Sequence, residues 1–114
     1  MAVQGTRLTG EKILDELKKC GVTHIVWLLG SELRFMYEAM ISQKEITLVP
    51  FCREGEGVAI AAGLILGGKK PVMLYQNAGL YEAGDSLRLV LDCTPMIGQI
   101  GLGGSGGVIH CSPD

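Results

Sequence analysis

The sequence predicts an α/β domain in which a parallel sheet is covered by helices on both faces. Short continuous apolar runs, such as HIVWLL at 24–29, are typical of strands that are buried on both sides. These runs alternate with segments whose apolar residues recur at helical spacing. A chain that alternates helix and strand in this way brings each strand back parallel to the last one, with the helices packed on the faces of the sheet.

The first expected element is an amphipathic helix with recognisable ends. Leu14 and Leu17 fall on one face, Thr9 is a candidate N-cap, and Gly21 follows two lysines at the carboxyl end. The later elements are expected, in order, as a strand at 24–29, a helix from Ser31, a strand at 46–49, a largely buried helix at 55–66, a strand at 72–76, a helix at 84–92 and a strand at 96–100.

Composition limits the classes of function. The chain has 114 residues, 47% of them hydrophobic, and a net charge of −2. This fits one small globular domain and argues against nucleic acid as a partner, because no basic patch is available. The longest uncharged apolar run, 58–66, is much shorter than the roughly 20 residues of a membrane span, and the first residues lack the apolar stretch of a signal peptide. We therefore expect a cytoplasmic protein without a membrane partner.

Neither the cysteines nor the glycine-rich end predicts a metal or phosphate site. The four cysteines include no C-x-x-C pair, so they indicate neither zinc nor a disulfide framework. After residue 101 the alternating pattern stops in a glycine-rich segment, and no helical pattern follows it as a phosphate-binding loop would require. We divide the chain into a domain at 1–101 and a glycine-rich tail at 102–114.

Polar residues follow the first three expected strands. Ser31 comes after the first, Arg53, Glu54 and Glu56 after the second, and Asn77 after the third. Each has an ordinary explanation: a helix N-cap for the serine, the positive end of a helix for the glutamates, and a turn for the asparagine. Because the carboxyl ends of parallel strands meet at one edge of a sheet, where ligands of such sheets bind, together they predict a site there.

Two segments resemble the pyrimidine-binding domain of thiamine-diphosphate-dependent decarboxylases, in particular that of the sulfopyruvate and phosphonopyruvate decarboxylases. They are REGEGVAIAAG at 53–63 and QNAGLYEAGDSLR at 76–88, within a resemblance that covers 8–101. In this family an acid opens a helix and a glycine follows nine residues later. Glu54 lies nine residues before Gly63, so the match favours Glu54 over Glu56 as the family's glutamate.

The resemblance implies that Glu54 activates the cofactor. In the family this glutamate hydrogen-bonds a ring nitrogen of the aminopyrimidine and shifts it toward the imino tautomer, so that the exocyclic nitrogen takes the proton from the thiazolium carbon. Such a carboxyl is expected in a dry pocket. The small residues that follow it would let the helix approach a flat ring closely. Glu56 is then an ordinary first-turn carboxylate, and Arg53 is expected to pair with it or with a substrate acid.

The resemblance assigns further residues to the cofactor and to the substrate. Gln76, Asn77 and Gly79 match the family's loop beside the aminopyrimidine. Ser31, Asn77 and Arg53 are expected to bind the carboxylate of a small 2-oxo acid. The related decarboxylases commonly have Pro-Asp before that serine, where this chain has leucine and glycine, so the resemblance does not fix the substrate.

The resemblance also implies a partner. The family binds the cofactor's diphosphate and its Mg²⁺ in a second domain, through a Gly-Asp-Gly motif and a later asparagine. Asn77 is the chain's only asparagine, so the metal is expected on a diphosphate-binding β subunit or domain and not on this chain. The family pattern stops near residue 101, so we expect a pyrimidine domain truncated at its C-terminus, either as a fragment or as a shortened or divergent subunit. Its open edge and apolar surface would favour a homodimer or a larger oligomer.

Two classes of function stay open. The chain is either the pyrimidine-binding half of a 2-oxo acid decarboxylase, active only with its partner chain, or a non-catalytic domain that acts in binding or assembly. The presence of Glu54 favours the first class, and the truncated end favours the second. A third interpretation, a generic nucleotide-binding domain, lacks a glycine-rich loop that is followed by a helix.

Overall fold

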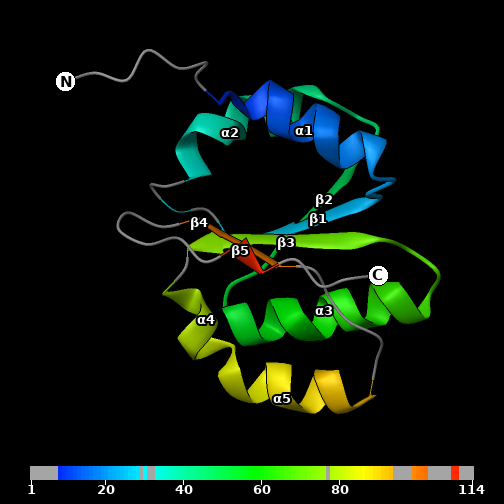
Figure 1. Cartoon of the computed structure of the whole chain (residues 1–114), viewed down its shortest axis with the longest axis vertical. Helices are drawn as coiled ribbons and strands as arrows, with labels where there is room; N and C mark the ends of the chain where they lie inside the picture. Colours follow the sequence, from blue (N-terminus) through cyan, green and yellow to red (C-terminus); the bar gives the residue numbers. More distant parts are fainter. Residues whose placement is uncertain are drawn as a thin grey trace.

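The computed structural model describes residues 8–28, 30, 33–76, 78–93, 99–102 and 109–110. Its strands are β1 His24–Trp27, β2 Thr47–Pro50, β3 Pro71–Gln76, β4 Gln99–Leu102 and β5 Ile109–His110. They form one five-stranded sheet in the order β2-β1-β3-β4-β5 (Figure 1). β1 is parallel to β2 and to β3, and β3 is parallel to β4. The predicted parallel sheet is therefore confirmed.

Helices cover both faces of this sheet, also as predicted. Helices α1 (Gly10–Lys19) and α2 (Arg34–Ser42) lie on one side. Helices α3 (Glu54–Leu66), α4 (Gly79–Glu82) and α5 (Gly84–Cys93) lie on the other, where α5 packs against α3 (Figure 1). The start of α3 and the short α4 both lie at the carboxyl edge of the sheet, which is where the site is expected.

The strand β3 separates two apolar clusters. Its side chains alternate between the faces, so Val72 and Leu74 join the cluster under α1 and α2, while Met73 and Tyr75 join the cluster over α3. All four of these side chains are buried. A strand that is apolar on both faces is what a sheet covered on both sides requires, and it explains the continuous apolar run in the sequence.

The ends of α1 agree with the sequence prediction. The Thr9 hydroxyl accepts a hydrogen bond from the backbone N–H of Lys12 at 3.3 Å, which makes Thr9 the N-cap. Leu14 and Leu17 are buried, and Gly21 adopts a positive φ of 79° directly after the helix. Such a conformation favours glycine, and it turns the chain into β1.

The prediction that the helix at 55–66, which is α3, is largely buried is wrong for the single chain. Only Gly57, Val58, Ala61 and Ala62 are buried among the 13 residues of α3. Ala59, Gly63 and Leu66 are exposed. Small and apolar residues lie on every side of this helix, so the sequence carries no periodic signal that separates the face packed on the sheet from the outer face.

Other differences concern short elements and element ends. The α-helix α2 begins at Arg34, whereas the expected start at Ser31 lies outside the described residues. The four-residue helix α4 was not expected, nor was β5, which pairs antiparallel with β4 within the segment assigned to the tail. Among the described residues, no helix combines the length and apolar character needed to cross a membrane.

Candidate active site at the carboxyl edge of the sheet

The structure brings two of the expected site residues into contact. Glu54 opens α3 after β2, and Gly79 opens α4 after β3. Glu54 is half-buried and Gly79 is buried. A Cβ added to Gly79 would lie 2.6 Å from Cδ of Glu54, closer than real Cβ atoms approach a neighbour. The carboxyl group thus occupies the space that a side chain at position 79 would need.

Of the other expected site residues, the structure describes Gln76 and Arg53 but not Ser31 and Asn77. Gln76 is the last residue of β3 and is exposed at the same edge of the sheet. Arg53 immediately precedes Glu54 and is also exposed. Ser31 and Asn77 lie outside the described residues, so their part in the site stays a prediction.

Glu82, at the end of α4, holds both chain neighbours of Glu54. One of its carboxylate oxygens, Oε2, accepts a hydrogen bond from the backbone N–H of Gly55 at 2.7 Å. The other, Oε1, accepts from Nε and Nη2 of Arg53 at 3.0 and 2.7 Å. Arg53 therefore forms its ion pair with Glu82 and not with Glu56, one of the two partners that the sequence suggested.

These contacts change the acidity of Glu82. The Gly55 N–H, and after it the Arg53 guanidinium, lower the pKa of Glu82 below its ordinary value of 4.5. The side chain of Glu54 lowers this pKa as well, to a smaller extent. Glu82 is consequently an anion at neutral pH, next to the residue expected to activate the cofactor.

Tyr75 is a further group near Glu54. Its side chain is 1% exposed, on the face of β3 that α3 covers. Burial, and to a smaller extent the charge of Glu54, raises the pKa of Tyr75 to about 12. The phenol therefore stays protonated at neutral pH, and the charge of the site is carried by the glutamates and Arg53.

Glu56 has a structural role at the start of α3. Its Oε2 accepts a hydrogen bond from the backbone N–H of Cys52 at 3.2 Å, so it reaches back over the beginning of the helix to the residue before the N-cap. This agrees with its interpretation as a first-turn carboxylate. Gly57, one residue further on, lets the helix lie against Phe51 and Met73, because a Cβ there would come within 2.8 and 3.0 Å of those side chains.

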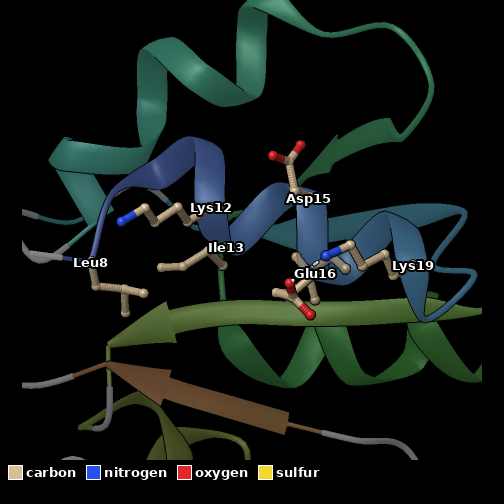
Figure 2. Close-up of a pocket in the computed structure, with 7 residues that line it drawn as sticks. Leu8, Lys12, Ile13, Asp15, Glu16 and Lys19 are labelled. Atoms are coloured by element: carbon tan, nitrogen blue, oxygen red, sulfur yellow. Dashed lines mark hydrogen bonds and ion pairs between the residues drawn. The ribbon is translucent and has the colours of Figure 1, made fainter. Parts of the chain in front are cut away.

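Of two pockets in the described structure, one lies beside the start of α3 and the other lies on the opposite face of the sheet. One, of about 390 Å³, lies beside the Glu82 contacts and is lined by Arg53, Gly55, Glu56, Glu82, Asp85 and Ser86. The other, of about 540 Å³, lies along α1 and is lined by Leu8, Ile13, Leu17 and charged side chains (Figure 2). Neither pocket is lined by Glu54, Gln76 or Gly79. Among the described residues there is no group of three or more His, Cys, Asp or Glu that could hold a metal ion.

Comparison with known proteins identifies the family. A family model described as the thiamine pyrophosphate enzyme N-terminal TPP binding domain matches residues 7–97. The chain belongs to this family. Thiamine pyrophosphate is another name for thiamine diphosphate, so the match agrees with the resemblance carried by the segments at 53–63 and 76–88.

Two curated relatives are named sulfopyruvate decarboxylase subunit alpha. The protein from Methanococcus maripaludis is 29% identical over 80 residues, which are 70% of this chain and 46% of the relative. The protein from Methanothermobacter thermautotrophicus is 33% identical over 72 residues, which are 63% of this chain and 44% of the relative. The matched part therefore spans less than half the length of these relatives.

The residues at the edge of the sheet fit the cofactor that this family binds. The aminopyrimidine of thiamine diphosphate is a flat ring with nitrogens that need hydrogen-bond partners. Glu54 offers a carboxyl group that is only half-buried, and the absence of a side chain at Gly79 lets this carboxyl lie against the backbone of the loop after β3. A carboxyl that can either donate or accept a proton is a suitable partner for a ring nitrogen.

The sequence reasoning missed Glu82 and Tyr75. Tyr75 lies in the apolar strand expected at 72–76, and nothing in that pattern marks it as a residue near the site. A signal for Glu82 does exist, because the N-cap position of α3 is Arg53, and an arginine side chain cannot accept a hydrogen bond from the backbone. A helix that begins in this way leaves its first N–H groups to water or to an acceptor from another part of the chain.

Proposed function

We propose that this chain is the pyrimidine-binding half of a thiamine-diphosphate-dependent 2-oxo acid decarboxylase, in which Glu54 binds and activates the cofactor. One observation carries the proposal. Glu54, which matches the family's glutamate, and Gly79, which matches the family's loop beside the cofactor, are 25 residues apart in sequence and in direct contact at the carboxyl edge of the sheet, where sheets of this type bind ligands.

The part of Glu54 is to bind a ring nitrogen of the aminopyrimidine and to hold the proton that it shares with that nitrogen. When bound, thiamine diphosphate supplies the carbon nucleophile and the electron sink for decarboxylation of a 2-oxo acid. The chain's own residues are proposed to orient the ring: Gly79 by letting the Glu54 carboxyl lie against its backbone, and Gln76 and Asn77 by belonging to the loop that matches the family's loop beside the ring. Tyr75 is buried in the apolar cluster on the α3 side of the sheet, where its phenol stays neutral near the charge of Glu54.

The substrate is proposed to be a small 2-oxo acid whose carboxylate is bound by Ser31, Asn77 and Arg53. Arg53 is 78% exposed and uses two of its five N–H donors on Glu82, within the described part of the chain. The remaining N–H donors could bind the substrate's carboxylate while Arg53 keeps its ion pair with Glu82. The names of the two relatives support a 3-carbon 2-oxo acid with a second anionic group, such as sulfopyruvate.

A diphosphate-binding β subunit or domain is proposed to bind the Mg²⁺ and to complete the site. Two features support association with another chain. Glu54 is only half-buried and lies outside both described pockets, whereas a proton-sharing carboxyl works best in a dry site. The apolar helix α3 also has an exposed face with Ala59, Gly63 and Leu66, and helices that are apolar all round are normally covered. We propose that this exposed face of α3 also forms the contact of a homodimer or larger oligomer.

The test is cofactor binding by the chain with and without the partner that co-purifies with it. Titration calorimetry with thiamine diphosphate and Mg²⁺ should show saturable one-to-one binding by the complex and much weaker binding by the isolated chain. If the complex binds no cofactor, or if no diphosphate-binding chain or domain is associated with this one, the alternative of a non-catalytic binding or assembly domain replaces the proposal.

A further inference from the structure

The N-cap residue of α3 does not cap the helix with its side chain. The first N–H groups of a helix have no partner inside the helix, and the N-cap side chain normally accepts from one of them. Here the N-cap is Arg53, which forms no such bond in the described structure and has no acceptor to offer. Glu82, which is 27 residues away from Gly55 in sequence, accepts from the N–H of that residue instead.

The same carboxylate holds the residue on each side of Glu54. Arg53 precedes Glu54 and donates two hydrogen bonds to Oε1 of Glu82, and Gly55 follows Glu54 and donates one to Oε2. The backbone of Glu54 is therefore attached to α4 both before and after its Cα. Since α4 also begins with Gly79, this attachment sets the distance between the Glu54 side chain and the glycine on which it packs.

Close packing leaves little freedom in this attachment. A Cβ on Gly55 would lie 2.9 Å from the Ser86 hydroxyl of α5 and 3.6 Å from Oε2 of Glu82. The first turn of α3 thus lies directly on α4 and α5 at this point. A shift of the turn away from α4 would lengthen the bonds from Gly55 and Arg53 to Glu82.

We propose that Glu82 is the positioning residue of Glu54: its bonds to Arg53 and Gly55 hold the first turn of α3 so that the Glu54 carboxyl stays against Gly79. The inference rests on the proposed function of Glu54 for its catalytic consequence, but its structural part is independent of any cofactor. Glu82 acts through Glu54 and is not itself assigned to the reaction.

The structural part is tested by nuclear magnetic resonance on the full chain. In the wild type, the side-chain γ protons of Glu54 and the α protons of Gly79 should give a strong nuclear Overhauser effect. We expect Glu82→Ala to weaken it severalfold and to remove the protection of the Gly55 amide against hydrogen exchange. Glu82→Gln, which keeps one acceptor oxygen, should give an intermediate result and serves if the alanine variant does not fold. Asp85→Asn removes an exposed neighbouring carboxylate that pairs only with Arg88 among the described residues, and should change neither signal.

The catalytic part is tested by proton exchange at the thiazolium carbon, in the complex with the partner chain. Displacement of a catalytic group by about 1 Å can cost roughly 100-fold in rate, so Glu82→Ala should slow the exchange by about 10- to 100-fold. Cofactor affinity should change much less, and Glu82→Gln should recover part of the rate. A merely structural role would lower the amount of folded protein without this difference between rate and affinity.

The outcomes separate this inference from the proposed function. An unchanged Glu54–Gly79 signal in Glu82→Ala overturns the positioning role, whatever Glu54→Gln does. Suppose that Glu82→Ala weakens the Glu54–Gly79 signal but exchanges the thiazolium proton at the normal rate, while Glu54→Gln is inactive. This result also overturns the positioning role. A weakened signal while Glu54→Gln keeps full activity supports the structural attachment and instead removes the proposed function of Glu54.

Discussion

The side chain of Glu54 packs directly on the backbone of Gly79. Any side chain at position 79 would displace this carboxyl group, because an added Cβ would lie 2.6 Å from Cδ of Glu54. The two residues open different helices, on either side of β3 in sequence. The contact therefore depends on the parallel sheet, which brings the ends of β2 and β3 to the same edge.

Gly79→Ala should move the Glu54 carboxyl and thereby impair cofactor activation. We expect proton exchange at the thiazolium carbon to fall by about 10- to 100-fold, since the acid would no longer lie where the cofactor needs it. Gly84→Ala is the matched control, because Gly84 also opens a helix and no described atom lies within 4 Å of its added Cβ. Exchange rates that are equal in the two variants would contradict the role of the Glu54–Gly79 contact.

Two glycines of α3 should respond in opposite directions to replacement by alanine. At Gly57 the added methyl meets the Phe51 ring at 2.8 Å, so Gly57→Ala should lower the free energy of unfolding by about 1–3 kcal/mol. Gly63 is exposed, with no described atom within 4 Å, so Gly63→Ala should raise it by about 0.5–1 kcal/mol through helix propensity. Urea denaturation at low chain concentration measures both, and a shared sign would refute the packing described for α3.

Stability should depend on pH through Glu82. Its pKa is lowered in the folded chain, so its contribution is fully present above the ordinary value of 4.5 and is lost as the pH falls through the lowered value. Glu82→Gln should therefore be less stable than the wild type near neutral pH, and this difference should shrink in acid. Thermal unfolding at the two pH values checks it. A difference that stays constant, or grows in acid, would show that the carboxylate is not stabilised by Gly55 and Arg53.

Self-association should depend on the exposed face of α3. Ala59→Glu places a charge on this face without disturbing the single chain, because Ala59 is exposed there, and it should shift the chain toward monomer. Ile41→Glu is the control on the opposite side of the sheet, where an apolar residue that is 53% exposed on α2 is replaced in the same way. Analytical ultracentrifugation distinguishes them. Dissociation by Ile41→Glu alone would place the contact on α2 instead.

Much of the fold could be predicted because its signals are local. The apolar run that contains Ile25 and Val26 predicted a buried strand, and Thr9 and Gly21 marked the ends of α1. The exposed face of α3 could not be found in this way. Alanine and glycine are small enough to be buried or exposed, so Ala59 and Ala61 look alike in sequence although one is exposed and the other buried.

The candidate site could be predicted only in part. Glu54 was found because its spacing to Gly63 matches a family pattern, and Gly79 because it lies in the segment that follows. Glu82 acts through contacts with residues 27 and 29 positions away, and these depend on how α4 packs on α3. A helix of four residues is also too short to show any periodicity, so no local pattern marks α4.

The most direct test of the account compares Glu54→Gln with Glu56→Gln in the complex with the partner chain. Glutamine keeps the shape of either side chain, but at position 54 it cannot share a proton with the aminopyrimidine. Proton exchange at the thiazolium carbon should therefore fall by about 10²- to 10⁴-fold in Glu54→Gln, with a much smaller loss of cofactor affinity. Glu56→Gln retains an oxygen that can accept from Cys52, so its exchange rate should stay near that of the wild type. Equal losses in both variants, or no loss in Glu54→Gln, would contradict the proposed catalytic role.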